Sequence, residues 1–356
     1  MAVLFSINNF LNSAIHRLFL FIVIYPLSVN AQHPEGVKLV KAKDENRIDI
    51  YIGTSVFTRF IYPDTLEKPV LFPIYDADGT LITRGFPMNP RPGEPTDHPH
   101  HLGLWFTYEN VNDLDFWNNS YAIPAEKKHL YGWIKTDRIL EITNGPTGVL
   151  RYHANWVNQQ KEILMEETTR FEFSGNSQER VIDRITELKA DRDIFFTDAK
   201  DGMLGLRLAH ELQIPAMQTQ QFTDNKGNIT LVKKDSVANG NYLTSEGKQG
   251  DSAWSTRARW CKVFGKIGND SVSITIFDHK DNPNYPTFWH ARGYGLFAAN
   301  PLGEKIFTNG KSSLNLRLKK GNRILFRYRI LIQNGKSTYS ADYLNQEAKT
   351  FNKNFE

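Results

Sequence analysis

Apolar and polar residues alternate along most of the chain, with the period of two that is typical of strands with one buried face. Residues 48–52 and 150–156 show the pattern most clearly. Turn signals rich in Asp, Asn, Gly and Pro, such as 76–79 and 144–146, separate the apolar runs. Because the connections are short or polar, the pattern predicts antiparallel strands and argues against helical crossovers.

A hairpin is predicted near the C-terminus. Leu314, Leu316 and Leu318 precede a turn at 319–322, and apolar residues occupy every second position of 324–332 after it. The polar positions in between include two arginines. We therefore expect two paired strands with one apolar and one largely basic face.

One helix is predicted after this hairpin. Positions 343, 344, 347, 348 and 351 recur on one helical face, and Ser340 is a suitable N-cap. We expect this helix to pack over an edge or end of a sheet.

The fold class that these patterns predict is all-β. No repeat of fixed period is present, which argues against a propeller or a β-helix. The large number of strands favours two large packed sheets over separate small sandwiches. We therefore predict a large antiparallel β-sandwich, a supersandwich, with a short C-terminal helix, formed as a single domain by residues 32–356.

Residues 1–31 have the pattern of a signal peptide. His16 and Arg17 precede the apolar stretch 18–29, and Val29 and Ala31 place small residues before Gln32. The alternative is a retained anchor, but a spanning helix needs about 20 apolar residues. The sequence therefore predicts cleavage before Gln32 and a periplasmic or secreted protein.

Charge and cysteine content exclude several classes of protein. The chain has 43 Lys and Arg against 39 Asp and Glu, a formal net charge of +4, and its basic residues are scattered. A nucleic-acid partner is not expected, because binding favours a clustered basic face. Cys261 is the single cysteine, which excludes an internal disulfide and predicts a buried small residue. No later apolar stretch is long enough to span a membrane. After cleavage, the protein is therefore not expected to associate with a membrane.

The segment 84–117 breaks the alternation with dense polar and aromatic residues. Four prolines between residues 87 and 95 predict an extended surface loop. Three histidines, His98, His100 and His101, follow within four positions, and Trp105 and Trp117 come after them. Such histidines could bind a metal, hydrogen-bond a sugar and move its proton, or order the loop through Asp97.

Two further segments carry candidate residues. In 277–303, a strand ending in His279 leads through a proline loop to Trp289, His290, Arg292 and Asn300. Arginine could hold a carboxylate or a pair of hydroxyls, and tryptophan could stack on a sugar. The alternative for each tryptophan is a place in the core.

Acidic candidates come from two other places. Asp201 lies in a turn before Arg207, on a strand-like run. Glu166 and Glu167 are adjacent, so alternation allows at most one of them to face a given cleft.

These segments resemble a family of secreted bacterial proteins labelled methane oxygenase PmoA-like. The resemblance covers roughly residues 50–335, and one departure is Leu102, where the family has an arginine. Any role of that arginine in substrate binding therefore does not carry over. The motifs are His98-Pro-His-His101-x-Gly-Leu-Trp-Phe, with Val111-Asn112 and Asp115-Phe-Trp117 after it, Asp201-Gly-x-x-Gly-Leu-Arg207, and Trp289-His290-x-Arg292-Gly-Tyr-Gly-Leu-Phe-x-x-Asn300-Pro.

The label of the family conflicts with the sequence. A methane oxygenase subunit of that name is built of apolar membrane helices, and this chain has none after cleavage. The family's association with sugar oxidoreductases and isomerases in Bacteroidetes implies glycan breakdown, by analogy.

The leading functional hypothesis is a carbohydrate-active enzyme of glycoside-cleaving, lyase or epimerase type, acting on a saccharide or glycoside without a cofactor. It would use a supersandwich resembling the galactose mutarotase-like fold, whose sites use histidine and carboxylate on a large concave sheet. His101 and His290 would then be proton donor and acceptor, Asp201 or Glu167 the carboxylate, and Arg292 the orienting group. The remaining candidates would bind substrate: His98, His100, Trp105, Trp117, Arg207, His279, Trp289 and Asn300.

Two alternatives remain. A non-catalytic carbohydrate-binding protein would account for the tryptophans but not for the number of histidines. A metal-dependent hydrolase or oxygenase would use His98, His100 and His290 as ligands, although no spaced metal motif is present.

Overall fold

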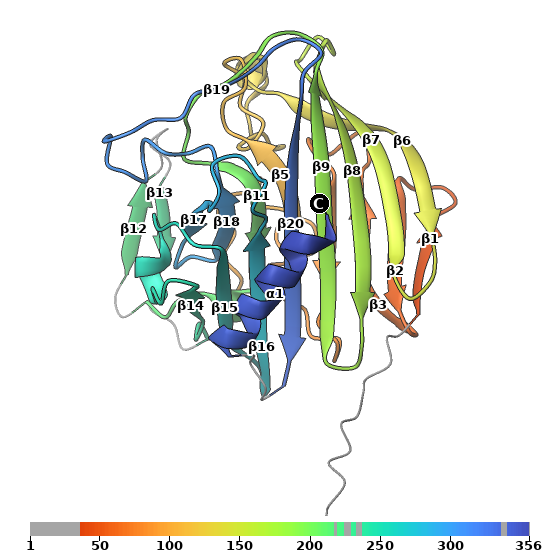
Figure 1. Cartoon of the computed structure of the whole chain (residues 1–356), viewed down its shortest axis with the longest axis vertical. Helices are drawn as coiled ribbons and strands as arrows, with labels where there is room; N and C mark the ends of the chain where they lie inside the picture. The colour runs from red at the N-terminus through yellow and green to blue at the C-terminus, as the bar shows by residue number, and fades with distance from the viewer. Residues whose placement is uncertain (1–35, 217–218, 224–228, 233–236, 336–339, 356) are drawn as a thin grey trace, which may run out of the picture. The chain divides into compact units, whose positions relative to one another are not determined.

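The computed structural model describes residues 36–216, 219–223, 229–232, 237–335 and 340–355. The predicted signal peptide lies outside these residues. The described chain is built almost entirely of antiparallel strands, with two large sheets, and the prediction of an all-β sandwich is confirmed. Figure 1 shows the two sheets as layers that face each other.

Sheet I has eight strands, in the order β1-β2-β3-β4-β5-β11-β18-β17. Its strands come from both ends of the sequence, because β17 and β18 join a sheet that begins with β1. The bounds are β1 Val37–Lys41, β2 Arg47–Ile52, β3 Ser55–Ile61, β4 Val70–Ile74, β5 Leu104–Tyr108, β11 Gly202–Arg207, β17 Phe288–Ala291 and β18 Leu296–Asn300.

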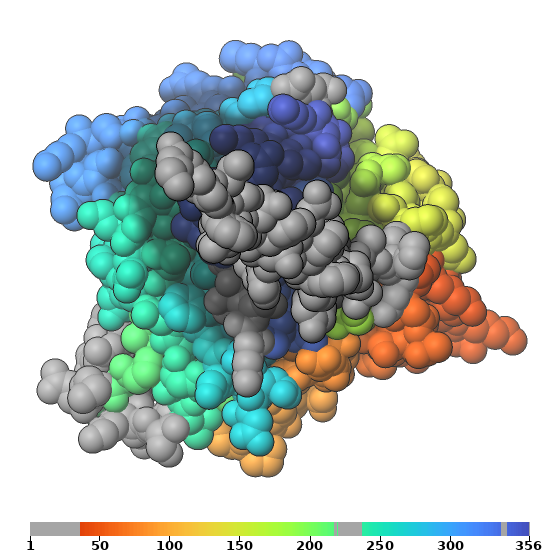
Figure 2. All heavy atoms as spheres, turned by 60° about the horizontal axis from the view of Figure 1, so that its bottom comes forward, coloured from red at the N-terminus to blue at the C-terminus, as the bar shows by residue number. Residues whose placement is uncertain are grey.

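Sheet II also has eight strands, in the order β14-β15-β16-β20-β9-β8-β7-β6. In Figure 2 the N-terminal strands, red to orange, lie on the opposite side of the visible face from the teal segment near residue 250. The bounds are β6 Trp133–Thr143, β7 Gly148–Val157, β8 Ile163–Gly175, β9 Glu179–Ala190, β14 Asn241–Thr244, β15 Trp260–Ile267, β16 Asp270–Asp278 and β20 Arg323–Asn334.

Short elements complete the fold. Two pairs of short strands lie outside the large sheets, and three 3-10 turns occur in the connections. The pairs are β10 Ile194–Phe196 with β19 Leu316–Leu318, and β12 Gln220–Thr223 with β13 Ile229–Val232; the turns are η1 Ala125–Leu130, η2 His210–Leu212 and η3 Gly250–Ala253.

The inner faces of the two sheets enclose one apolar core. The alternating isoleucines of β2 are fully buried in it, as the sequence pattern predicted. Aromatic rings bridge the layers: Phe60 lies 4.6 Å from Tyr152, and Phe106 lies 5.4 Å from Phe326, between ring centroids. Cys261 is buried there as expected.

Helix α1 (Ala341–Asn354) covers the outer face of sheet II. Leu344, Ala348 and Phe351 form an apolar cluster with Trp260, Phe277 and Leu331 of three neighbouring strands. The Ser340 hydroxyl accepts a hydrogen bond from the Tyr343 backbone N–H, so the predicted helix and its N-cap are confirmed. No helix among the described residues is long and apolar enough to span a membrane.

The predicted hairpin at 314–332 is wrong in its pairing. Both strands exist, but β19 pairs with β10, whereas β20 pairs with β16 and β9. The twelve-residue β20 lies inside sheet II, so both of its edges are already hydrogen-bonded. The alternation on β20 itself is as predicted, with Phe326 and Tyr328 in the core.

Candidate functional site

Two segments that are far apart in the sequence meet on the outward face of sheet I. The register pairs His290 of β17 with Ala298 of β18. Gly205 of β11 then pairs with Ala298 on one side and with Trp105 of β5 on the other. Paired residues share one face of a sheet, and Phe106, next to Trp105, belongs to the core. This row therefore points away from the core, and three strand spacings separate its ends by roughly 14 Å.

The histidine loop, residues 95–101, is shaped by a buried arginine. Arg84 donates hydrogen bonds to the carbonyl oxygens of Pro95, Asp97, His98 and His101, at 2.7–3.3 Å. Burial lowers the pKa of Arg84 to about 9, and the nearby charge of Arg207 acts in the same direction. Because four carbonyl oxygens of one loop converge on it, this guanidinium fixes the path of the backbone.

Asp97 connects this loop to sheet I. Its Oδ1 accepts hydrogen bonds from Arg84 Nη1 and Arg207 Nη2, both at 2.7 Å. Its Oδ2 lies 2.6 Å from His98 Nδ1. Burial alone would raise the pKa of Asp97, but Arg207, His98 and Arg84 together hold that pKa far below its usual value. The carboxylate therefore stays ionised.

The three histidines of the loop form one cluster with the tryptophans, in which His100 and Trp117 meet the His101 ring edge-on. The rings of His98 and His101 are parallel, with centroids 4.7 Å apart. His101 also lies 4.3 Å from His100 and 5.1 Å from Trp105. Burial lowers the pKa of all three imidazoles, well below the ordinary value for His100 and His101. They are therefore neutral at neutral pH.

Their partners give His98 and His101 opposite tautomers. Arg207 Nη1 lies 3.1 Å from His101 Nδ1, and a guanidinium only donates, so this Nδ1 accepts and the proton of His101 is on Nε2. His98 Nδ1 faces a carboxylate, which only accepts, so this Nδ1 carries the proton and Nε2 has the lone pair. One ring can thus donate a proton through Nε2, and its neighbour can accept one.

Gly205 lets two tryptophans lie on the sheet. A Cβ at this position would come within 2.5 Å of the Trp105 ring and 2.8 Å of the Trp117 ring. The two indoles are fully buried, with centroids 5.0 Å apart. Neither indole N–H has a hydrogen-bond partner within the described ranges. They form the wall of the cluster, and their faces do not present an open stacking surface.

Lys68 is a member of the cluster that the sequence analysis did not identify. Its Nζ donates to the Trp117 carbonyl oxygen at 3.0 Å and lies 5.7 Å from the Trp105 ring centroid. Burial lowers the pKa of Lys68 to about 7, although the charge of Glu67 opposes this. A lone lysine before an apolar run gives no signal of burial, so the pattern could not reveal it.

His290 and Asp201 form the other side of the site. Their Nδ1 and Oδ1 atoms are 3.3 Å apart, and both residues are buried. Burial lowers the pKa of His290 well below the ordinary value, and the positive charges of Lys200 and Arg292 act in the same direction.

Tyr294 lies between the two sides. Its ring stacks on His98 at 5.1 Å, and the guanidinium carbons of Arg207 and Arg292 lie 5.2 and 5.9 Å from its centroid. Burial raises the pKa of Tyr294, and the carboxylate of Asp201 acts in the same direction. Tyr294 occurs in a predicted motif but was not named as a site residue.

Several predicted residues lie elsewhere. Glu167 is between the sheets, where Tyr152, Trp156, Thr169 and Arg184 donate to its oxygens. This carboxylate therefore does not face the histidines. Of the two faces of its strand, Glu167 lies on the one that is buried in the core.

Three other candidates have structural surroundings. Trp289 is in the core and donates to the Ala258 carbonyl oxygen, and His279 packs against Phe351 under α1. The Asn300 side chain donates to the carbonyl oxygens of Ala199 and Lys200, so it supports the segment before Asp201.

The metal hypothesis has no geometric support in the described part of the chain. There, no three His, Cys, Asp or Glu side chains are grouped as metal ligands. The cluster contains two histidines of opposite tautomer, the fixed carboxylate of Asp97, and Lys68, whose pKa is lowered. These groups are suited to proton transfer.

Comparison with known protein families assigns the chain to one family. Residues 47–349 match DUF6807, a family of unknown function, and the chain belongs to this family. No curated protein matches the sequence.

Solved structures show distant likeness only. A galactose mutarotase-like protein from Clostridium acetobutylicum has 9% identity and a TM-score of 0.40, covering 85% of this chain and 99% of that one. A galactose mutarotase related enzyme from Lactobacillus acidophilus has 8% identity and a TM-score of 0.31, covering 85% and 98%. A GH36 alpha-galactosidase from Geobacillus stearothermophilus has 10% identity and a TM-score of 0.40, covering 84% of this chain and 41% of that one. Scores at this level do not define a function.

Proposed function

We infer that the chain is an exported enzyme that moves protons on a saccharide or glycoside at the histidine cluster. The observation that carries this proposal is the opposite tautomers of His98 and His101, fixed by Asp97 and Arg207. His98 Nε2 acts as the base, and His101 Nε2–H is the proton donor. Export rests on the predicted signal peptide, residues 1–31.

The fixed carboxylate makes His98 a stronger base when it is needed. As His98 takes up a proton, the ring becomes an imidazolium 2.6 Å from an ionised carboxylate. Asp97 stabilises that charge, and the paired arginines keep the carboxylate from taking the proton itself. On the opposite side, Asp201 lies 3.3 Å from His290 Nδ1 and would stabilise a proton taken up by His290.

A saccharide suits the groups that remain for binding. Sugar hydroxyls both donate and accept hydrogen bonds, and the cluster offers neutral imidazoles of both kinds. Abstraction of a proton by one histidine and delivery by another is the chemistry of epimerases, lyases and mutarotation.

The non-catalytic alternative has less support. A protein that only binds sugars presents aromatic faces to solvent, whereas Trp105, Trp117 and Trp289 are fully buried. The buried ion pairs and shifted pKa values are also more typical of a catalytic site than of a stacking surface.

The experiment compares His98→Asn with the unmodified protein. Asparagine keeps an N–H near the position of Nδ1, so the contact with Asp97 is preserved while the Nε2 base is removed. Conversion of a panel of mono- and disaccharides is followed by ¹H NMR. We expect about a hundredfold or greater loss of rate with an unchanged unfolding midpoint.

The control is His129→Asn, since His129 is exposed on η1 outside the cluster. Wild-type rates in His98→Asn would contradict the proposal. Unfolding of His98→Asn would instead favour a structural role, namely that the histidines order the loop.

A further inference from the structure

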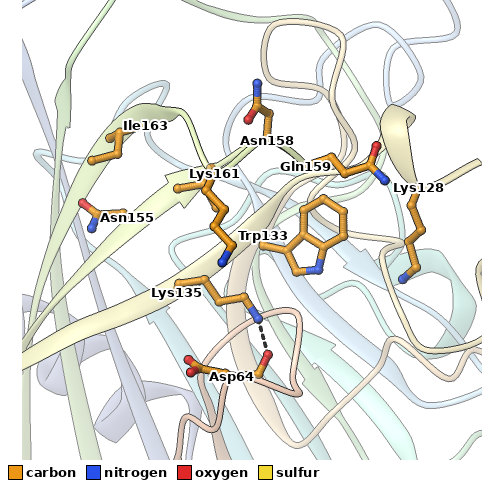
Figure 3. Close-up of a pocket in the computed structure, with 10 residues that line it drawn as sticks. Asp64, Lys128, Trp133, Lys135, Asn155, Asn158, Gln159, Lys161 and Ile163 are labelled. Carbon is orange, nitrogen blue, oxygen red and sulfur yellow. Dashed lines mark hydrogen bonds between the residues drawn. The ribbon is translucent and has the colours of Figure 1, made fainter. Parts of the chain in front are cut away.

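A cavity of about 630 Å³ lies at the β6 edge of sheet II. Its walls come from η1, the start of β6, the end of β7 and the turn that follows β7. No member of the histidine cluster lines it. The volume is in the range of small-molecule sites, and Figure 3 shows the side chains that surround it.

Trp133 occupies the middle of this cavity. The indole is only partly buried, unlike Trp105 and Trp117, so one face can be contacted by a ligand. Lys128 Nζ lies 5.7 Å from its ring centroid. In Figure 3 the ring stands between Lys128 on one side and Lys135 and Lys161 on the other. An exposed indole beside polar groups is the usual platform for the apolar face of a sugar ring.

Three lysines give the cavity a positive charge. Lys135 Nζ donates to two backbone carbonyl oxygens, of Asp64 and Leu66, each at 2.6 Å, and no carboxylate neutralises it at hydrogen-bond distance. Lys161 is exposed, and its ammonium group has no hydrogen-bond or ion-pair partner among the described residues. Burial lowers the pKa of Lys135; Lys128 and Lys161 lower it further, against Glu67 and Asp64. All three lysine side chains line the same cavity (Figure 3).

Acidic groups offset this charge only in part. Glu67 Oε1 lies 3.7 Å from Lys128 Nζ, which also donates to Asn119 and Ser120. The Asp64 carboxylate is at the rim; in Figure 3 it extends away from Trp133, because its backbone carbonyl rather than its side chain faces Lys135. Three cations against two carboxylates leave a net positive cavity with unused N–H donors on Lys135 and Lys161.

The turn fixes Lys161 in a conformation that normally favours glycine. Its φ is +65°. Backbone hydrogen bonds from Lys161 N to Asn158 O and from Asn158 N to Glu162 O close the turn, and Glu162 N donates to the Asn158 side chain. A glycine would suit this backbone better, so the ammonium group is present at the cavity despite a local cost.

We propose that this cavity binds an acidic saccharide, with a sugar ring on Trp133 and a carboxylate or sulfate group on Lys161 and Lys135. The amides of Asn155, Asn158 and Gln159 line the same cavity and match the hydroxyl groups of such a ligand. The site is separate from the proposed catalytic histidines and does not depend on their function. It would hold an acidic glycan chain on the enzyme.

The first test is calorimetric titration of the full-length protein with three probes: tetragalacturonate, a neutral galactose tetramer and sodium sulfate. We expect tetragalacturonate to bind at least about tenfold more tightly than either of the others. Equal binding of the neutral and acidic sugars would overturn the proposal. Sulfate binding as tightly as the acidic sugar would show an anion site without a role for the sugar ring, and would also overturn it.

Variants then assign the binding to this cavity. Trp133→Ala and Lys161→Gly should each weaken tetragalacturonate binding by about tenfold. Lys161→Gly is the sharper test, because glycine fits a φ of +65° and the fold is retained. Lys127→Gln is the matched control, since Lys127 is exposed on η1 next to Lys128 but does not line the cavity.

A substitution of Asp64, the carboxylate at the rim, is expected to strengthen binding rather than weaken it. Asp64→Asn removes a negative charge, so it should tighten tetragalacturonate binding about twofold to fivefold and leave the neutral tetramer unaffected. The control Lys127→Gln should not change binding, because Lys127 does not line the cavity. Wild-type binding in Lys161→Gly, or lost binding in Lys127→Gln, would contradict the assignment.

Discussion

Asp97 is the residue on which the candidate site depends most. One carboxylate accepts from two arginines and a histidine, and it thereby links the histidine loop to β11. The buried guanidinium groups of Arg84 and Arg207 need this counterion, because an unpaired buried charge is strongly unfavourable. The same ion pairs that hold the loop therefore also set the tautomers of its histidines.

Lys68 has an electrostatic cost that can be measured. A lysine has a pKa of about 10.4 in an unfolded chain, and burial lowers it to about 7 here. Because the lysine pKa is lower in the folded state, the unfolded state binds more protons between these two pH values. The loss in free energy of unfolding is therefore complete below pH 7 and disappears as the pH rises toward 10. Lys68→Met removes the cost but leaves the Trp117 carbonyl without its donor.

We predict that Lys68→Met raises the free energy of unfolding at pH 7 by about 1–3 kcal/mol. The gain should shrink toward pH 9.5, where the unmodified lysine is neutral in the folded state. Urea unfolding at both pH values measures this, with the exposed Lys127→Met as control. A larger gain at pH 9.5 than at pH 7 would refute the role of burial.

Single residues also show where sequence patterns succeed and fail. The histidines and Arg207 could be identified because proline-rich loops and polar strand ends can be recognised in the amino-acid sequence. Glu167 could not be placed, because alternation tells which residues share a face but not whether that face meets the core or a cleft. Lys68 carried no pattern at all.

Among the elements, α1 shows how a short helix is held on a sheet. Its apolar face packs on Trp260, and the Trp260 indole N–H donates to the Asn345 side chain at 3.0 Å. The N-cap hydrogen bond of Ser340 adds to this packing. Helical spacing predicted the apolar face and the N-cap, but it predicted neither the partner strands nor the contact of Asn345 with Trp260.

The N-cap gives a prediction for this element. Ser340→Ala should lower the free energy of unfolding by about 1 kcal/mol, because the Tyr343 N–H loses its acceptor. Ser340→Asp should keep the stability, since aspartate also caps. Urea unfolding and amide exchange of residues 341–354 measure both variants, and equal stability of the alanine and aspartate variants would show that the cap is dispensable.

The pairing of the strands with one another could not be predicted from the sequence. The pattern at 314–332 is that of a hairpin, and local sequence cannot reveal that β20 pairs with β16 and β9. Long-range pairing depends on which edges are free after the rest of the sheet has formed. That information is spread over the whole chain.

At the scale of the molecule, the two sheets cannot be separated by one cut in the chain. Sheet I takes β1–β5 from the first part and β11, β17 and β18 from the later part. Sheet II takes β6–β9 and then β14–β16 and β20. Both halves of the sequence are therefore needed for each layer.

We predict that residues 36–200 and 201–356, expressed separately, do not fold. Each fragment would expose core faces of both sheets, so cooperative unfolding should be absent in circular dichroism. Mixing the two fragments should restore strand signal, because the missing partners are then present. A stable, cooperatively unfolding fragment would contradict this account of the architecture.

The pairing of β11 with β18 has a consequence for biosynthesis. The histidine loop leaves the ribosome about 190 residues before His290 does, which at 5–20 residues per second is a delay of roughly 10 to 40 s. Until β17 and β18 arrive, β11 has an open edge, and the loop lacks Tyr294 above His98. The nascent chain therefore carries an incomplete histidine cluster, and a chain truncated before His290 lacks both His290 and Tyr294.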